Sequence, residues 1–186
     1  MTNIALRRTL SRGQVLTGAI TLALLGTTMC PSFAAQSESV AITPLTPLVK
    51  ASMWLNGAPS NTSLRGKVVL VDVFTFDCIN CKNITPNLRS LERSKRSDGL
   101  TILGIHSPET AYEHEHSAVV TNLKALGVTW PVAIDNDFAL WNAYHIDSWP
   151  TQLIFDRRGA LRKVIVGDSQ DALVNATIDA LLRERA

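Results

Sequence analysis

Apolar residues in this chain follow two patterns, short runs and longer stretches in which they recur every three or four positions. A run such as Val68–Phe74, interrupted only by Asp72, predicts a strand that is buried on both faces, as strands of parallel sheets are. The second pattern places apolar side chains along one face of a helix. Strands are predicted at Val68–Phe74, Leu100–Ile105, Pro131–Ile134, Thr151–Phe155 and Leu161–Val166.

Four helices are predicted around these strands. The first begins at Ile79, and a capping box of Thr110 and Glu113 opens the second, which ends at Gly127. The third covers Phe138–Tyr144, and Asp168 or Ser169 caps the fourth. The residues expected to face inward are Ile84, Leu88 and Leu91 in the first helix, Val119, Val120, Leu123 and Leu126 in the second, and Leu173, Ala176, Ala180 and Leu181 in the fourth.

The predicted order β-α-β-α-β-α-β-β-α favours an α/β fold with a central mixed sheet flanked by helices. Before the first long strand, the segment from Trp54 to Gly66 predicts a short hairpin, an N-terminal extension of the fold. Residues 35–52 are rich in Ser, Thr and Pro and are expected to form a flexible lead-in. The folded domain is therefore expected over residues 53–186.

Residues 1–34 have the pattern of an export signal. Arg7, Arg8 and Arg12 form a basic front, Val15–Met29 is mostly apolar, and small residues permit cleavage after Ala34. The apolar run is short, so a cleaved signal is favoured over a retained membrane span. The arginine pair also permits the twin-arginine route beside the general secretory route. We therefore expect export to the periplasm.

Composition limits the possible functions. Removal of the signal would leave 152 of the 186 residues, enough for one domain with a full core. The chain has 18 Lys and Arg and 16 Asp and Glu, and loss of the three signal arginines would leave a net charge of −1. This balance gives no support for nucleic-acid binding. Of the three cysteines, Cys30 would leave with the signal, and Cys78 and Cys81 would remain.

Cys78 and Cys81 follow a predicted strand and stand at the start of a predicted helix. At that position, unpaired N–H groups and the helix dipole favour a thiolate on the first cysteine. A purely structural disulfide is disfavoured because so short a loop would restrict the unfolded chain little. A structural zinc site lacks a second pair of ligands at a suitable spacing. The pair therefore predicts thiol–disulfide chemistry.

Three further features stand in register with the cysteines. Asp72 lies six residues before Cys78, Pro86 lies five after Cys81, and Trp149-Pro150-Thr151 opens a later strand. With these residues, the segment from about Trp54 to Leu182 resembles a thioredoxin-fold thiol-disulfide oxidoreductase of the TlpA-like group, DipZ-like branch. The motifs that indicate this branch are Asp77-Cys78-Ile79-Asn80-Cys81, His106-Ser107-Pro108-Glu109 and Asp135-Asn136-Asp137.

The resemblance implies roles for the matching residues. A carboxylate at the position of Asp72 lies buried beneath the disulfide, where burial should raise its pKa and make it a base for Cys81. A cis-proline at Pro150 faces the active site, and the backbone beside it pairs with an incoming substrate chain. The residues expected to contact substrate are Trp149, Pro150, Thr151, Phe76, Ile79 and Asn80.

These features predict an exported protein-disulfide oxidoreductase that uses no cofactor. Cys78 would attack a substrate disulfide, and Cys81 would then release the reduced substrate. The resemblance implies disulfide-containing exported proteins as substrates and a membrane electron donor of the DsbD or CcdA type. Ile79 and Asn80 add no positive charge beside Cys78, and Asp77 should oppose its thiolate, so a reductant is favoured over a disulfide-forming oxidant.

A copper carrier with the thioredoxin fold is the alternative from another class. Such carriers use two cysteines and a distant histidine, and the chain offers His106, His114, His116 and His145. Their cysteines are normally separated by three residues, whereas this chain has two. Thiol–disulfide exchange is therefore favoured.

Overall fold

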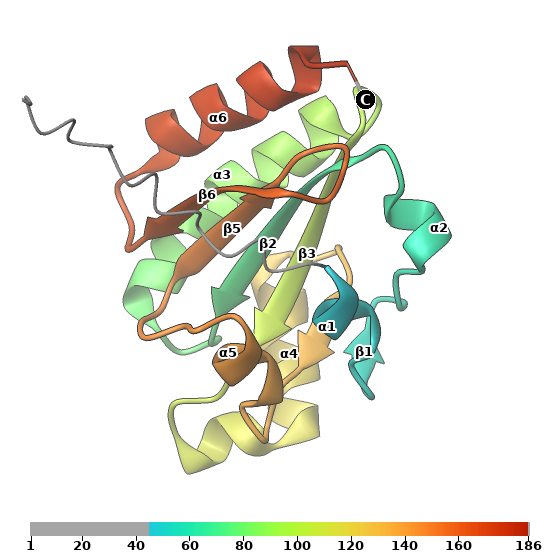
Figure 1. Cartoon of the computed structure of the whole chain (residues 1–186). Coiled ribbons are helices and arrows are strands. Elements are labelled where there is room, and N and C mark those ends of the chain that lie inside the picture. The colour runs from blue at the N-terminus through green and yellow to red at the C-terminus, as the bar shows by residue number, and fades with distance from the viewer. Residues whose placement is uncertain (1–44, 186) are drawn as a thin grey trace, which may run out of the picture. The chain divides into compact units, whose positions relative to one another are not determined.

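The computed structural model describes residues 45–185 of the chain (Figure 1). The predicted signal peptide and most of the predicted lead-in lie outside the described residues. Within residues 45–185, no helix is both long enough and apolar enough to cross a membrane.

A six-stranded mixed sheet with the order β1-β4-β3-β2-β5-β6 forms the centre of the fold (Figure 1). Strands β2, β3 and β4 are parallel, and β1, β5 and β6 run antiparallel to their neighbours. The strands are β1 Trp54–Leu55, β2 Val68–Phe74, β3 Leu100–His106, β4 Val132–Ile134, β5 Thr151–Phe155 and β6 Leu161–Val166. The predicted central mixed sheet is confirmed.

Helices cover both faces of this sheet (Figure 1). Alternate residues of β2 join one core cluster with apolar side chains of α3, α4 and α6. The intervening residues of β2 join a second cluster with side chains of α1 and α5, as the two-residue period of a strand requires. The helices are α1 Thr46–Val49, α2 Asn61–Leu64, α3 Ile79–Lys95, the 3-10 turn η1 Ala111–His114, α4 His116–Leu126, α5 Ala139–Ala143 and α6 Asp171–Arg183.

The N-terminal part of the domain differs from the prediction in two ways. The expected hairpin is wrong, because β1 pairs antiparallel with β4, with Trp54 opposite Ala133. A capping box of Ser60 and Ser63 starts α2 where the returning strand of a hairpin would be needed. The packed structure also begins before residue 53, because Leu48 of α1 is fully buried. The expected lead-in over residues 35–52 therefore ends too late.

The second predicted helix is divided. The capping box of Thr110 and Glu113 forms as predicted, but it opens only η1, and α4 starts after an extended Glu115. Val119 is fully buried, whereas Val120 is 43% exposed, so the prediction that Val120 faces inward is wrong. Consecutive residues lie about 100° apart around a helix, and only one of the two can face the sheet.

Helix α6 buries Leu181 as predicted, but the other residues that it buries differ from those predicted. Its buried residues are Val174, Ile178 and Leu181, spaced by four and three positions. Leu173 is 40% exposed, and Ala176 and Ala180 are exposed as well. The predicted caps, Asp168 and Ser169, were also wrong, because Gln170 is the N-cap residue and Ser169 lies in a turn at φ 61°.

Two positions in α6, five residues apart, should therefore respond differently to truncation. We expect Ile178→Ala to lower the free energy of unfolding by about 2–4 kcal/mol, because it opens a cavity in the core. We expect Leu173→Ala to change it by about 0.5 kcal/mol or less, because this side chain is largely exposed. Urea unfolding followed by circular dichroism measures both. A larger loss for Leu173→Ala would support the helix face predicted from sequence.

Candidate active site

The two cysteines lie where β2 passes into α3. Strand β2 ends at Phe74, and Cys78 is the N-cap residue of α3. The Cys78 Sγ accepts a hydrogen bond from the backbone N–H of Cys81, at 3.3 Å. Cys78 is half-buried, Cys81 is buried, and both are free thiols. The predicted position of Cys78 at a helix N-terminus is confirmed.

The environment of Cys81 favours the protonated thiol. Burial raises the pKa of the Cys81 thiol far above its ordinary value, and its hydrogen bond with Cys78 raises it further. The negative charge of Asp72 acts in the same direction, and a hydrogen bond from the backbone of Thr75 opposes it. A buried thiol of this kind needs a base before it can act as a nucleophile.

Asp72 lies within β2, on the sheet face that α3 covers, because side chains alternate along a strand. It is 3% exposed, and its Oδ1 has no hydrogen-bond partner among the described residues. Burial raises the pKa of Asp72 to about 7. The charge of Asp72 acts on Cys81, so the two groups interact. A carboxyl group with this pKa can take up or release a proton near neutral pH.

The loop before β5 carries Trp149 and Pro150, joined by a cis peptide bond. The Trp149 indole N–H donates a hydrogen bond to the backbone carbonyl of Ser107 at 3.0 Å, and its ring packs on Trp141 with centroids 4.3 Å apart. Within residues 45–185, the backbone N–H and C=O of Trp149 have no hydrogen-bond partner. Its side chain is fixed, while its peptide groups are unpaired.

The residues expected to contact substrate divide into exposed and buried sets. Ile79 is 67% exposed, and Asn80 is exposed beside it in the first turn of α3. Phe76 and Thr151 are 1% and 2% exposed, and the Phe76 ring is stacked on His106. The side chains of Phe76 and Thr151 are therefore turned into the core, and the expected contact of these two residues with substrate stays a prediction.

Glu113 is a buried carboxylate behind the active-site loop that the sequence indicated only as part of a capping box. It accepts hydrogen bonds from the Thr75 hydroxyl and from the backbone N–H of Asp77. Burial acts to raise the pKa of Glu113, but the hydrogen bonds from Thr75 and from backbone N–H groups outweigh it and lower the pKa below its usual range. No local spacing signals these contacts.

Asp135 supports the other side of the site and was predicted only as part of a family motif. It accepts hydrogen bonds from the Ser107 hydroxyl at 2.9 Å and from the backbone N–H groups of Leu140 and Trp141. Because Ser107 and Trp141 both contact Trp149, Asp135 links β4 and α5 to the loop that carries the cis peptide bond.

An ion pair of opposite charges lies beside Cys78 at the surface. The Asp77 carboxylate forms an ion pair with the Lys82 Nζ at 2.8 Å, and both side chains are exposed. The expected opposition of Asp77 to the Cys78 thiolate is thus reduced by Lys82, although an exposed pair is screened by solvent.

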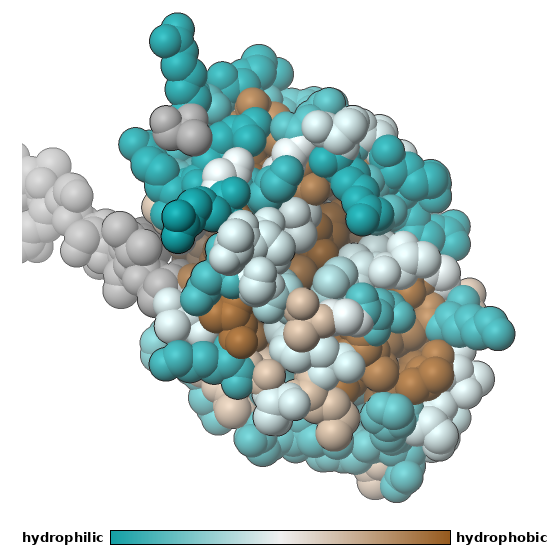
Figure 2. Space-filling model, turned by 90° about the vertical axis from the view of Figure 1, so that its right-hand side faces the viewer, coloured by the Kyte–Doolittle hydropathy of each residue, from teal (hydrophilic) through white to brown (hydrophobic). Residues whose placement is uncertain are grey.

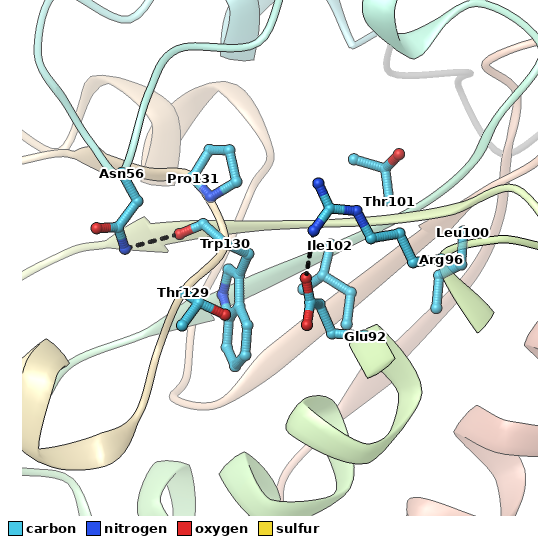
Figure 3. Close-up of a pocket in the computed structure, with 9 residues that line it drawn as sticks. All are labelled: Asn56, Glu92, Arg96, Leu100, Thr101, Ile102, Thr129, Trp130 and Pro131. Atoms are coloured by element: carbon cyan, nitrogen blue, oxygen red, sulfur yellow. Dashed lines mark hydrogen bonds and ion pairs between the residues drawn. The ribbon is translucent and has the colours of Figure 1, made fainter. Parts of the chain in front are cut away.

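A separate depression of about 250 Å³ lies at the opposite end of the sheet, where β3 begins (Figure 3). Asn56 donates a hydrogen bond to the Trp130 carbonyl at 3.1 Å on one side, and Arg96 pairs with Glu92 at 3.3 Å on the other. The depression has no cysteine in its lining.

Viewed from the side of β1 and α2, polar side chains cover most of the surface, with apolar patches between them (Figure 2).

Residues 45–185 contain no ligand set that would support the copper-carrier alternative. There, no group of three or more His, Cys, Asp or Glu side chains is arranged to hold a metal ion. His106 is fully buried between the rings of Phe74 and Phe76. Burial lowers the pKa of His106 to about 4.

Comparison with known proteins agrees with this geometry. A family model described as thioredoxin-like matches residues 66–161. The DipZ proteins of Mycobacterium bovis and Mycobacterium tuberculosis are 33% identical over 160 residues, which cover 83% of this chain and 23% of DipZ. The chain thus spans about a quarter of the length of these relatives. The thiol-disulfide oxidoreductase YkuV of Bacillus subtilis is 26% identical, over 76% of this chain and 95% of YkuV.

A solved structure shows the same fold. The solution structure of a thioredoxin-like protein in the oxidized form matches with a TM-score of 0.67 and 25% identity. The match covers 78% of this chain and 97% of that protein. With the sheet order, the Cys78–Cys81 pair and the family match in agreement, the chain belongs to the thioredoxin-like family of thiol-disulfide oxidoreductases, in the TlpA/ResA-like group that includes DipZ.

Proposed function

We propose that this chain reduces disulfide bonds of exported proteins through Cys78 and Cys81. One observation carries the proposal: a half-buried thiol at a helix N-terminus is followed one turn later by a buried thiol, and a buried carboxylate lies in the preceding strand. A purely structural cysteine pair would need neither the helix N–H groups at its outer sulfur nor Asp72 in the strand beneath it.

In the first step, the Cys78 thiolate attacks one sulfur of a substrate disulfide. A bond forms between Cys78 and that sulfur, and the other substrate cysteine leaves as a thiolate. The backbone N–H of Cys81 stabilises the attacking sulfur through the bond at 3.3 Å. The exposed Ile79 and Asn80 flank the point of attack.

In the second step, Asp72 takes the proton of Cys81. The Cys81 sulfur then attacks Cys78, which closes the Cys78–Cys81 disulfide and releases the second substrate sulfur as a thiolate. The positions of the two groups support this assignment, since Asp72 is buried and unpaired at Oδ1 and its charge acts on Cys81.

The substrate chain would lie along the loop that carries Trp149. Unpaired backbone N–H and C=O groups pair readily with an extended chain, as in the addition of a strand to a sheet. The carbonyl of Pro150 is already paired with the N–H of Gly167 at 2.9 Å, so the groups of Trp149 are the ones that remain for substrate.

The proposal includes the setting in which the protein works. The pattern of residues 1–34 supports export to the periplasm. Each turnover leaves Cys78 and Cys81 oxidised, so another dithiol must return two electrons to them. A membrane electron donor of the DsbD or CcdA type would supply these electrons.

The direction of electron transfer is set by the relative stability of the dithiol and disulfide forms of Cys78 and Cys81. Burial and Asp72 both disfavour a thiolate on Cys81, and the positive charge of Lys82 is paired with Asp77. These features favour the disulfide in this chain and hence transfer of electrons to substrate. They oppose the alternative of a disulfide-forming oxidant, in which the reduced form is stabilised.

The two cysteines should give different phenotypes. We expect Cys78→Ser to abolish the catalysis of insulin reduction with dithiothreitol as the electron source, because the attacking sulfur is lost. We expect Cys81→Ser to accumulate mixed disulfides through Cys78, because the resolving sulfur is lost. Non-reducing electrophoresis and mass spectrometry detect these species. Alkylation of reduced wild-type protein at Cys81 before Cys78 would reverse the assigned roles.

The redox potential should identify the direction of transfer. We expect a value below about −200 mV, nearer to thioredoxin at about −270 mV than to DsbA at about −120 mV. Equilibration with glutathione buffers, followed by alkylation of free thiols, measures it. A value close to that of DsbA would make the protein an oxidant.

Asp72 should make stability depend on pH. Its pKa is about 7 in the folded protein and near 3.8 in the unfolded chain, so folding takes up a proton between these pH values. The stability linked to protonated Asp72 is present below pH 4 and is lost as pH rises through 7. We therefore expect Asp72→Asn to change stability little near pH 4 and to raise the free energy of unfolding by up to about 4 kcal/mol at pH 8.

Kinetic measurements distinguish a catalytic base at position 72 from a residue there that is only buried. In Asp72→Asn, we expect release of substrate from the mixed disulfide to slow by roughly 100-fold above pH 7, while the first attack changes less. Asp98→Asn is the matched control, because Asp98 is exposed and follows the end of α3 far from the cysteines. Equal release rates for wild-type protein and Asp72→Asn at every pH would remove the base from the mechanism.

A further inference from the structure

Glu113 makes more contacts than a capping box requires. It is 1% exposed, and its Oε2 accepts hydrogen bonds from the backbone N–H groups of Glu109 and Thr110, each at 2.8 Å. Those bonds complete the local turn. Its Oε1 accepts from the Thr75 hydroxyl and from the Asp77 N–H at 3.1 Å, across 38 and 36 positions of the chain. One carboxylate thus joins the loop after β3 to the loop after β2.

The residues that Glu113 holds adjoin both thiols. Asp77 immediately precedes Cys78, and the backbone of Thr75 forms a hydrogen bond with Cys81. Phe76, between them, packs against His106 and Tyr112, with ring centroids 5.4 and 5.6 Å apart. The whole loop of residues 75–77 is therefore docked on the segment that contains Glu113.

We propose that Glu113 is a positioning residue for the dithiol: through Thr75 and Asp77 it keeps Cys78 in the N-cap conformation in which its Sγ accepts the Cys81 N–H. The proposal rests on the proposed function, since it assigns Glu113 to the thiol that attacks substrate. Glu113 itself touches neither sulfur nor substrate. Four hydrogen-bond donors keep its buried carboxylate charged, so it acts as a fixed acceptor.

Thr75 offers the sharpest test, because it can lose its hydroxyl without a change of charge. In a Cys81→Ser background, iodoacetamide alkylation of Cys78 is measured across pH in Thr75→Val and Thr75→Ser. We expect Thr75→Val to slow alkylation at pH 7 about fivefold and to move its titration midpoint upward, because the thiolate loses its fixed N–H donor. Thr75→Ser retains a hydroxyl and should restore the wild-type profile.

Two further variants, Glu113→Gln and Glu115→Gln, are measured in the same alkylation assay. Glu113→Gln should slow alkylation at least as much as Thr75→Val, and the double variant should lose little more, because both variants disrupt the same contact between Thr75 and Glu113. Glu115→Gln removes an exposed carboxylate two residues away, at the N-cap position of α4, where its side chain makes no capping hydrogen bond, and should match wild type. Circular dichroism confirms folding, and Thr75→Val carries the test if Glu113→Gln does not fold.

Three results would overturn the proposal. These are a Thr75→Val profile identical to wild type, a Thr75→Ser profile as slow as that of Thr75→Val, or an equal shift in Glu115→Gln. The proposed function has its own reference, the reduction of insulin by wild-type protein. Wild-type protein that fails to reduce insulin would contradict the proposed function, while the alkylation profiles would still decide the role of Glu113.

Discussion

Strand β2 has no face in contact with water, and the place of the redox centre follows from this constraint. Helices of both layers pack on its alternating side chains, so the chain can leave the core only at the end of the strand. There it enters α3, whose first N–H groups lack partners within the helix and meet Cys78. Asp72 lies deeper in the same strand, where water cannot solvate its charge.

Three buried carboxylates surround the site, and their surroundings give them different chemistry. Asp72 has one oxygen without a partner among the described residues, and burial raises its pKa to about 7. Glu113 accepts four hydrogen bonds that lower its pKa, so it stays charged. Asp135 accepts three and anchors α5 and Ser107. Burial raises the pKa of Asp135 as well, and of the three it is Asp72 whose charge acts on Cys81, so Asp72 is the carboxylate suited to exchange a proton with that thiol.

Features that depend on neighbouring residues could be predicted from the sequence, and features that depend on distant contacts could not. The buried strands and the helix that starts at Cys78 follow from local patterns. Strand β1 pairs with β4, which lies far along the chain, so neighbouring residues do not determine this pairing. Helix α6 has apolar residues on adjoining faces, including Leu173 and Val174, and only packing on the sheet selects between them. The reach of Glu113 to Thr75 likewise depends on two neighbouring parallel strands.

The outer strands of the sheet are poor templates for self-association. Strand β1 has only two residues, and β6 carries the exposed Arg162 and Lys163. Arg162 is paired with Asp156 at 3.1 Å and with Glu184 at 2.8 Å. Short edges and edge charges disfavour pairing between sheets of different molecules. The fold can therefore carry unpaired backbone groups at Trp149 while its sheet edges disfavour edge-to-edge assembly of copies of the chain.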